Sequence, residues 1–184
     1  MAAREMLRLA PGEWAVLGVV AERPTHGFAI AQLMVPDGPI GRVWTMPRPV
    51  VYQALNKLIQ ASLIAERATV PSDRGPARTI VAATPSGKRA VRGWLATPVG
   101  HIRDVRSLFL LKLALLDRID GDPRPLIDAQ HERFALLLDQ LRTYRDRADG
   151  FDRVLASWRL QSCEATLQFL QGITWPDRRA ERAR

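Results

Sequence analysis

The sequence predicts a mainly α-helical protein with one small β-hairpin, organised in two domains. Apolar residues recur at steps of three and four over most of the chain, the spacing of helices packed on a core. Only between residues 63 and 83 does the pattern become that of two strands around a turn-rich segment. The charge is divided as well, because residues 1–98 carry 12 basic and 6 acidic side chains, whereas residues 99–175 carry 11 of each.

The composition is that of an ordered protein. The 184 residues are 47% hydrophobic and 25% charged, enough for one large core or two small ones. The net charge of +8 is concentrated in the first half and favours a polyanionic partner. Cys163 is the single cysteine, so no intrachain disulfide can form. We find neither a signal peptide nor an apolar run long enough for a membrane span, and we expect a cytoplasmic protein without membrane contact.

Three helices should open the chain. Residues 11–22 form an apolar helix that stops before Pro24, because the residue before a proline is biased away from helix. Thr25 or His26 can cap a second helix, which runs through Phe28, Ile30, Ala31, Leu33 and Met34. The third helix begins at Pro47, where a first-turn backbone N–H would have no partner anyway.

The third helix has one apolar face and one polar face. The apolar stripe is Val51, Ala54, Leu55, Leu58 and Ile59. The polar face holds two cations and no carboxylate, and it comprises Arg48, Tyr52, Gln53, Asn56, Lys57 and Gln60. Asn and Gln can pair with adenine, and Arg, Lys and Tyr can reach phosphates. Taken alone, the pattern also fits a solvated surface helix that lacks Asp and Glu.

A hairpin and a fourth helix follow. The strands cover residues 63–69 and 79–83, and Arg74 and Arg78 flank the Gly-Pro tip between them. Thr84 should cap a helix over residues 85–96. Three helices followed by a basic hairpin are the parts of a winged helix-turn-helix, which we place at residues 8–98.

Residues 99–175 should form a three-helix dimerisation domain, with helices near 102–118, 124–147 and 151–173. The last helix carries two apolar stripes. One is Phe151, Leu155, Trp158, Ala165 and Phe169, and the other is Leu160, Cys163, Leu167 and Leu170. One stripe can pack on the chain's own helices, and a second copy of the protein is the simplest partner for the other. We expect residues 1–7 and 176–184 to be flexible termini.

Several motifs, in this order, resemble the PadR family of bacterial transcriptional regulators, in particular its subgroup with a longer C-terminal helical domain. They are Glu13–Gly18, Thr25–Phe28, Val51–Leu55, Leu58, Leu63-Ile64, Gly75–Arg78, Thr84–Gly87 and Phe109–Leu113, and the resemblance extends over residues 8–175. The chain departs from the family's pattern at Ser62, where glycine is usual, at Phe28, where tyrosine is usual, and at Ile80-Val81, where an aromatic residue is usual.

The resemblance implies a homodimeric repressor that binds a pseudo-palindromic operator in double-stranded DNA and is released by a small planar or aromatic effector. The expected DNA-binding residues are Arg48, Tyr52, Gln53, Asn56, Lys57, Arg74 and Arg78. The candidate effector-binding residues are Trp94, Trp158 and Trp175, because flat ligands stack on indole. The expected dimerisation residues are Leu108, Phe109, Phe151, Leu155, Trp158, Leu167 and Leu170.

Other function classes are less well supported. The three histidines are far apart in sequence, and Asp128, His131 and Glu132 on one helical turn fit a solvated face better than a metal site. With no Gly-rich phosphate loop or catalytic triad signature in the sequence, we predict no enzyme activity, no cofactor and no metal. A helical protein-interaction scaffold, or a constitutive DNA-binding protein without an effector, stays open as an alternative.

Overall fold

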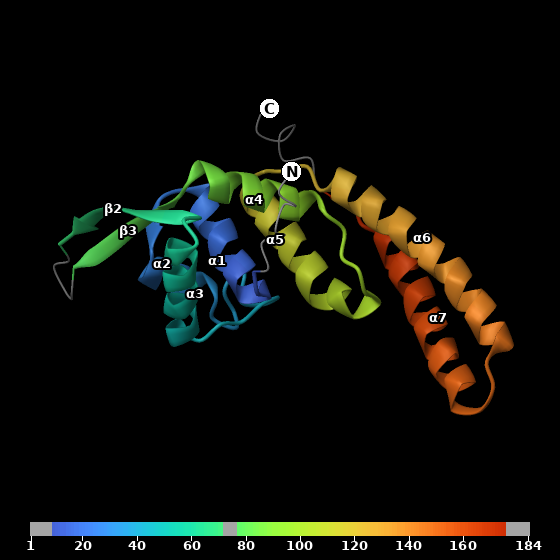
Figure 1. Ribbon diagram of the computed structural model, residues 1–184. Coiled ribbons are helices and arrows are strands. Elements are labelled where there is room, and N and C mark those ends of the chain that lie inside the picture. The colour runs from blue at the N-terminus through green and yellow to red at the C-terminus, as the bar shows by residue number, and fades with distance from the viewer. Residues whose placement is uncertain (1–8, 72–76, 176–184) are drawn as a thin grey trace, which may run out of the picture. The chain divides into compact units, whose positions relative to one another are not determined.

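The computed structural model describes residues 9–71 and 77–175, and it confirms the predicted fold class, mainly α-helical with a small antiparallel sheet (Figure 1). The chain divides into two compact units, residues 1–94 and 95–184.

The first unit contains helices α1 to α3, most of α4 (Figure 1), and the three described strands. The elements are, in chain order, α1 (Pro11–Glu22), β1 (Thr25–His26), α2 (Gly27–Leu33), α3 (Arg48–Gln60), β2 (Ile64–Val70), β3 (Arg78–Ala83) and α4 (Pro85–Ala96). Helices α1 and α3 pack on each other through Val16, Leu17, Val51 and Leu58, all fully buried. Each such side chain stabilises the fold by about 1.5–3 kcal/mol relative to an exposed position.

The sheet has three strands in the order β1-β3-β2, one more than the predicted hairpin. Strand β1 has only two residues, pairing Thr25 with Val81 and His26 with Ile80, so it is too short to show an alternating pattern in sequence. His26 also caps α2 as predicted, since its Nδ1 accepts a hydrogen bond from the Ala29 backbone N–H at 3.1 Å.

Helix α3 ends in a left-handed turn at Ser62, which has φ +55°. The Leu63 N–H donates to the Leu58 carbonyl and the Ser62 N–H donates to the Ile59 carbonyl, both at 2.9 Å. This is the Schellman arrangement, in which the left-handed residue is usually glycine. The turn aims the chain from α3 into β2. Thr84, the predicted cap of α4, accepts from the Gly87 N–H at 3.1 Å and donates to the Leu63 carbonyl at the base of this turn.

The second unit is helical throughout. It contains the 3₁₀ turn η1 (Ile102–Asp104), the π-helical turn η2 (Val105–Phe109), α5 (Leu110–Arg118), α6 (Arg124–Arg147) and α7 (Gly150–Gln171). The predicted helix over 102–118 is therefore regular only in its second half. Helices α6 and α7 form a hairpin (Figure 1). Phe109, Phe134 and Cys163 are fully buried in the unit's core.

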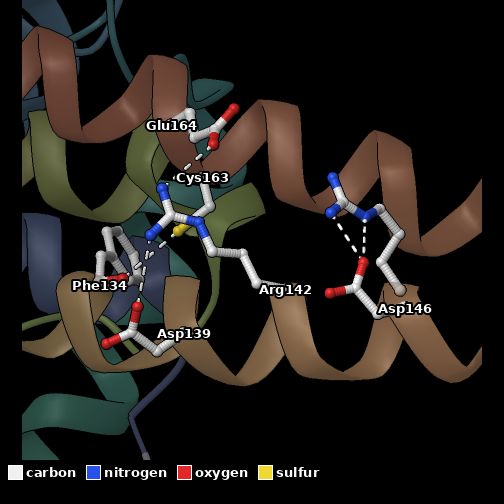
Figure 2. Close-up of polar contacts among 7 residues, drawn as sticks. Phe134, Asp139, Arg142, Asp146, Cys163 and Glu164 are labelled. Carbon is white, nitrogen blue, oxygen red and sulfur yellow. Dashed lines mark hydrogen bonds and ion pairs between the residues drawn. The ribbon is translucent and has the colours of Figure 1, made fainter.

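Polar side chains also join α6 to α7 (Figure 2). Arg142 lies 3.5 Å from both Asp139 on its own helix and Glu164 on α7. The Cys163 thiol lies 3.4 Å from the Phe134 carbonyl, and burial, with the neighbouring Glu164 charge, raises the pKa of the thiol. Cys163 is therefore a protonated core residue.

Two polar side chains are buried in the second unit, and the sequence pattern did not predict their burial. Gln130 is fully buried and exchanges two hydrogen bonds with the Val99 backbone, at 2.7 and 3.1 Å. Lys112 is only 3% exposed and donates to the Thr97 carbonyl. Burial lowers the pKa of Lys112 to about 8, since an ammonium loses its hydration there.

Candidate nucleic-acid interface

The polar face of α3 is exposed in the first unit. Its apolar stripe is buried, which leaves five of the predicted DNA-binding residues on the surface: Arg48, Tyr52, Gln53, Asn56 and Lys57. Arg78 begins β3 and is exposed too. Arg74 lies outside the described residues. The structure thus brings Arg78, on the hairpin, to the same surface as Arg48 and Tyr52, some thirty residues earlier in the chain.

Lys57 is engaged by a carboxylate from another helix. Its Nζ lies 2.9 Å from Glu13 Oε1 of α1, and the Glu13 Oε2 accepts from the Ala10 N–H at 2.8 Å. Burial by itself raises the pKa of Glu13, but the hydrogen bonds from Lys57 and Ala10 and the lysine charge lower it below its ordinary value. The expectation of a face without carboxylates is therefore corrected at one end of α3, because α1 supplies one.

A groove of about 490 Å³ separates α3 from the base of the hairpin. It is lined by His26, Gly27, Phe28, Arg48, Tyr52, Leu55, Asn56, Ile59, Glu66, Ala77, Arg78, Thr79 and Val81. Two of these side chains are arginines, and Glu66 is the one carboxylate among the described lining residues. The walls are thus cationic and aromatic, a combination suited to an anionic, extended ligand.

Phe28 lines this groove and contacts both of its arginines. The Arg48 guanidinium carbon sits 5.4 Å from the centre of the Phe28 ring and 5.7 Å from that of Tyr52. The Arg78 guanidinium carbon sits 5.7 Å from the same Phe28 ring. Gly27 lies beside them, and a Cβ there would lie 2.7 Å from the Tyr52 ring, so this ring would have to shift.

Phe28, an apolar residue of the predicted second helix, is not part of the core, since 40% of the residue is exposed. His26, Phe28 and Glu66 are groove residues that sequence reasoning missed. The only available signal for Phe28 was an aromatic residue directly after Gly27 in the first turn of a helix, where helical periodicity does not decide which way a side chain points.

The three candidate effector tryptophans have different environments. In the first unit, Trp94 stacks on Trp14 with ring centres 5.0 Å apart and planes 5° apart, so one of its faces is occupied. In the second unit, Trp158 is 64% exposed on α7, whereas Trp175 packs against the unit's core. Trp158 lies about 20 Å along α7 from Gln171, the last residue of the helix that precedes Trp175.

The expected dimerisation residues divide into buried and exposed sets. Phe109, Leu167 and Leu170 are buried in the core of their own unit. Leu108 and Leu155 are partly buried. Phe151 and Trp158, with 76% and 64% exposure, lie on the stripe of α7 that the chain's described residues leave uncovered. Tyr144 of α6 is exposed as well.

Within the described ranges, no three His, Cys, Asp or Glu side chains lie close enough together to hold a metal ion. Asp128 and Glu132 are exposed, and the His131 ring nitrogen instead meets the Gln171 amide at 3.1 Å. No helix in the described part of the chain is both long enough and apolar enough to cross a membrane.

Comparisons with known proteins find similarity among solved structures. No protein-family model matches the chain, and no curated protein matches it in sequence. The chain is similar to Bacillus subtilis PadR in complex with operator DNA, at 20% identity and a TM-score of 0.44, covering 86% of this chain and 95% of that one. For the same protein in complex with p-coumaric acid, the identity is 18% and the TM-score is 0.43, covering 88% of this chain and 95% of that one. The chain is also similar to smu.1604c from Streptococcus mutans UA159, at 18% identity and a TM-score of 0.42, covering 87% of this chain and 96% of that one.

Proposed function

We propose that this protein is a homodimeric, sequence-specific DNA-binding transcription regulator of the PadR type. The observation that carries the proposal is the shared surface of α3 and the hairpin, where exposed hydrogen-bonding residues of the helix adjoin a groove containing Arg48 and Arg78. Helix α3 would enter the major groove, and the hairpin would contact the neighbouring backbone or minor groove. In this proposal residues 8–98 bind DNA, and residues 99–175 dimerise and bind the effector.

Each exposed side chain of α3 has a role in this proposal. Gln53 and Asn56 have the amide geometry to pair with adenine, and they lie nearly one helical turn apart. Arg48, Tyr52 and Arg78 are suited to phosphate oxygens, which fix the helix in register without reading sequence. Lys57 keeps a 66% exposed side chain beside Glu13, and its ammonium has donors left for a phosphate.

A second copy of the chain would cover the exposed stripe of α7. Phe151, Val154 and Trp158 expose 76%, 63% and 64% at a spacing of three and four residues. Exposed apolar groups in such a row mark association surfaces. A twofold dimer presents two copies of α3, which is why the operator should be pseudo-palindromic. Phe151→Asp combined with Trp158→Asp should halve the mass in sedimentation, while Val70→Asp on β2 should not.

We also propose that a small planar aromatic compound releases the DNA, which makes the protein a repressor. The support is Trp158 on α7 of the second unit, which a single chain leaves 64% exposed. Release requires a ligand that binds one spacing of the two α3 helices better than the other. Titration of p-coumaric acid and related phenols, followed by tryptophan fluorescence and gel shift, tests this. If no compound alters DNA binding, the protein acts constitutively.

The decisive experiment is retention of genomic DNA fragments, followed by gel shift on the retained sequence. Tyr52→Ala and Arg78→Ala should each weaken binding by roughly tenfold, from the loss of about 1–2 kcal/mol of phosphate contacts. Tyr144→Ala and Arg103→Ala are matched controls, because they remove similarly exposed residues of the same type from the second unit. If no fragment is retained specifically, the scaffold alternative gains support, and equal effects of the four substitutions would refute the α3 surface.

A further inference from the structure

We propose that Phe28 is a positioning residue for DNA binding, whose single ring holds Arg48 of α3 and Arg78 of β3 in readiness for the phosphates. The inference rests on the proposed DNA-binding function and names the device that joins the helix to the hairpin. Phe28 itself comes from α2 and has no hydrogen-bonding atom in its side chain.

The evidence is that one exposed ring is shared by two cations from different elements. Both guanidinium carbons lie within 6 Å of the Phe28 ring centre, Arg48 at 5.4 Å and Arg78 at 5.7 Å. These are cation–π distances. Two like charges brought to one groove repel each other, and the attraction of each guanidinium to the ring offsets part of that repulsion without adding a carboxylate that would repel phosphate.

The type of contact that holds the two arginines determines which of their N–H donors remain available for phosphate. A cation–π contact is electrostatic, so it does not occupy the five N–H donors of a guanidinium as an ion pair with a carboxylate does. Lys57 shows the contrast, because its ion pair with Glu13 occupies one of its donors. Among the described residues, neither Arg48 nor Arg78 has a carboxylate within ion-pair distance. The ring therefore orders both arginines while leaving their phosphate-binding donors unused.

Ordering these side chains before binding removes part of the entropy that binding would otherwise cost. Phe28→Leu keeps an apolar side chain of similar length but removes the π face. We expect it to weaken binding to a random-sequence DNA duplex roughly tenfold at low salt, since two long side chains must then be ordered on binding. Phe28→Tyr keeps the ring and should bind within about twofold of the wild type.

A double-mutant cycle separates positioning from a general effect on folding. In the full-length chain with Arg48→Gln and Arg78→Gln, Phe28→Leu should have no further effect on DNA affinity, because nothing is left for the ring to position. Near-ultraviolet circular dichroism of the stacked Trp14–Trp94 pair reports whether each variant keeps the fold of the first unit. Phe28→Met serves as a second variant without a ring if Phe28→Leu does not fold.

The outcomes distinguish the two proposals. If the wild type does not bind duplex DNA at all, the proposed function fails, and this inference fails with it. If the wild type binds and folded Phe28→Leu or Phe28→Met binds equally well, only the positioning role is overturned. The same conclusion holds if the loss is as large in the Arg48→Gln/Arg78→Gln background.

Discussion

Ser62→Gly should stabilise the protein, although it changes no side-chain contact of the core. Ser62 is exposed and stands in the left-handed region at φ +55°, directly after α3. Its backbone carbonyl accepts from Thr84 Oγ1 at 2.9 Å and from Ser86 Oγ at 3.2 Å, and glycine keeps both hydrogen bonds. The substitution therefore changes the backbone conformational energy and little else.

The expected gain is a difference between two opposing effects. A left-handed conformation costs an L-residue about 1–2 kcal/mol, which glycine does not incur. Glycine also makes the unfolded chain more flexible, which costs about 0.4–1 kcal/mol. The net change in the free energy of unfolding should be a gain of about 0.5–1 kcal/mol. For a chain of this length, that corresponds to a rise of roughly 1–4 °C in Tm.

Urea unfolding monitored by circular dichroism measures this gain, with Ala61→Gly as the matched control. Ala61 is the adjacent exposed residue and has φ −77°, a conformation that alanine adopts without strain. Glycine there should be neutral or destabilising by up to about 1 kcal/mol. If Ser62→Gly lowers the urea midpoint, or shifts it in the same direction as Ala61→Gly, the assignment of strain to Ser62 is refuted.

Three further predictions concern charged groups. Glu13→Gln should destabilise the fold by about 1 kcal/mol near neutral pH. Because the pKa of Glu13 is lowered in the folded state, the loss of stability in the variant should be complete above about pH 4.3. It should disappear as the pH falls through the folded pKa. Burial lowers the pKa of Lys112 from 10.5 to about 8, so the unfolded state binds more protons between these values and stability should rise with pH there, by up to about 3 kcal/mol. Lys112→Met should remove that rise. Glu66→Gln, which removes a carboxylate from the groove, should tighten binding to duplex DNA about twofold.

Each of these has a contradicting result. Urea unfolding at several pH values would contradict the Glu13–Lys57 pairing if the variant's deficit persisted in acid. If the stability of the wild type and that of Lys112→Met changed in parallel with pH above about pH 8, the burial of the Lys112 charge would be contradicted. Weaker DNA binding by Glu66→Gln would indicate that the carboxylate accepts a hydrogen bond from a base.

Local signals in the sequence predicted most elements well. The apolar stripe of α3, the helix start after Pro47 and the Thr84 cap of α4 are each determined by residues within a few positions of one another. The two stripes of α7 also separated as expected, since one is buried and the other is largely exposed. These features follow from periodicity and capping, which need no knowledge of the rest of the fold.

Long-range features could not be predicted in this way. The Lys57–Glu13 ion pair joins residues 44 positions apart, and nothing in either helix identifies its partner. Strand β1 exists because β3 offers an edge to pair with, and the two arginines that lie over the exposed Phe28 ring come from elements distant in the sequence. Lys112 interrupts an apolar run, and the sequence does not indicate whether such a lysine is buried or extends to solvent.

The salt dependence of DNA binding tests the central claim most directly. If α3 and the hairpin bind phosphates, log K should fall linearly with log salt concentration, with a slope set by several contacts. Replacing Arg48 and Arg78 by Gln should make that slope shallower by about 2, whereas replacing the exposed Arg103 and Arg147 of the second unit should leave it unchanged. A flat dependence for the wild type, or equal slopes for the two double variants, would contradict a DNA-binding surface built from α3 and the hairpin.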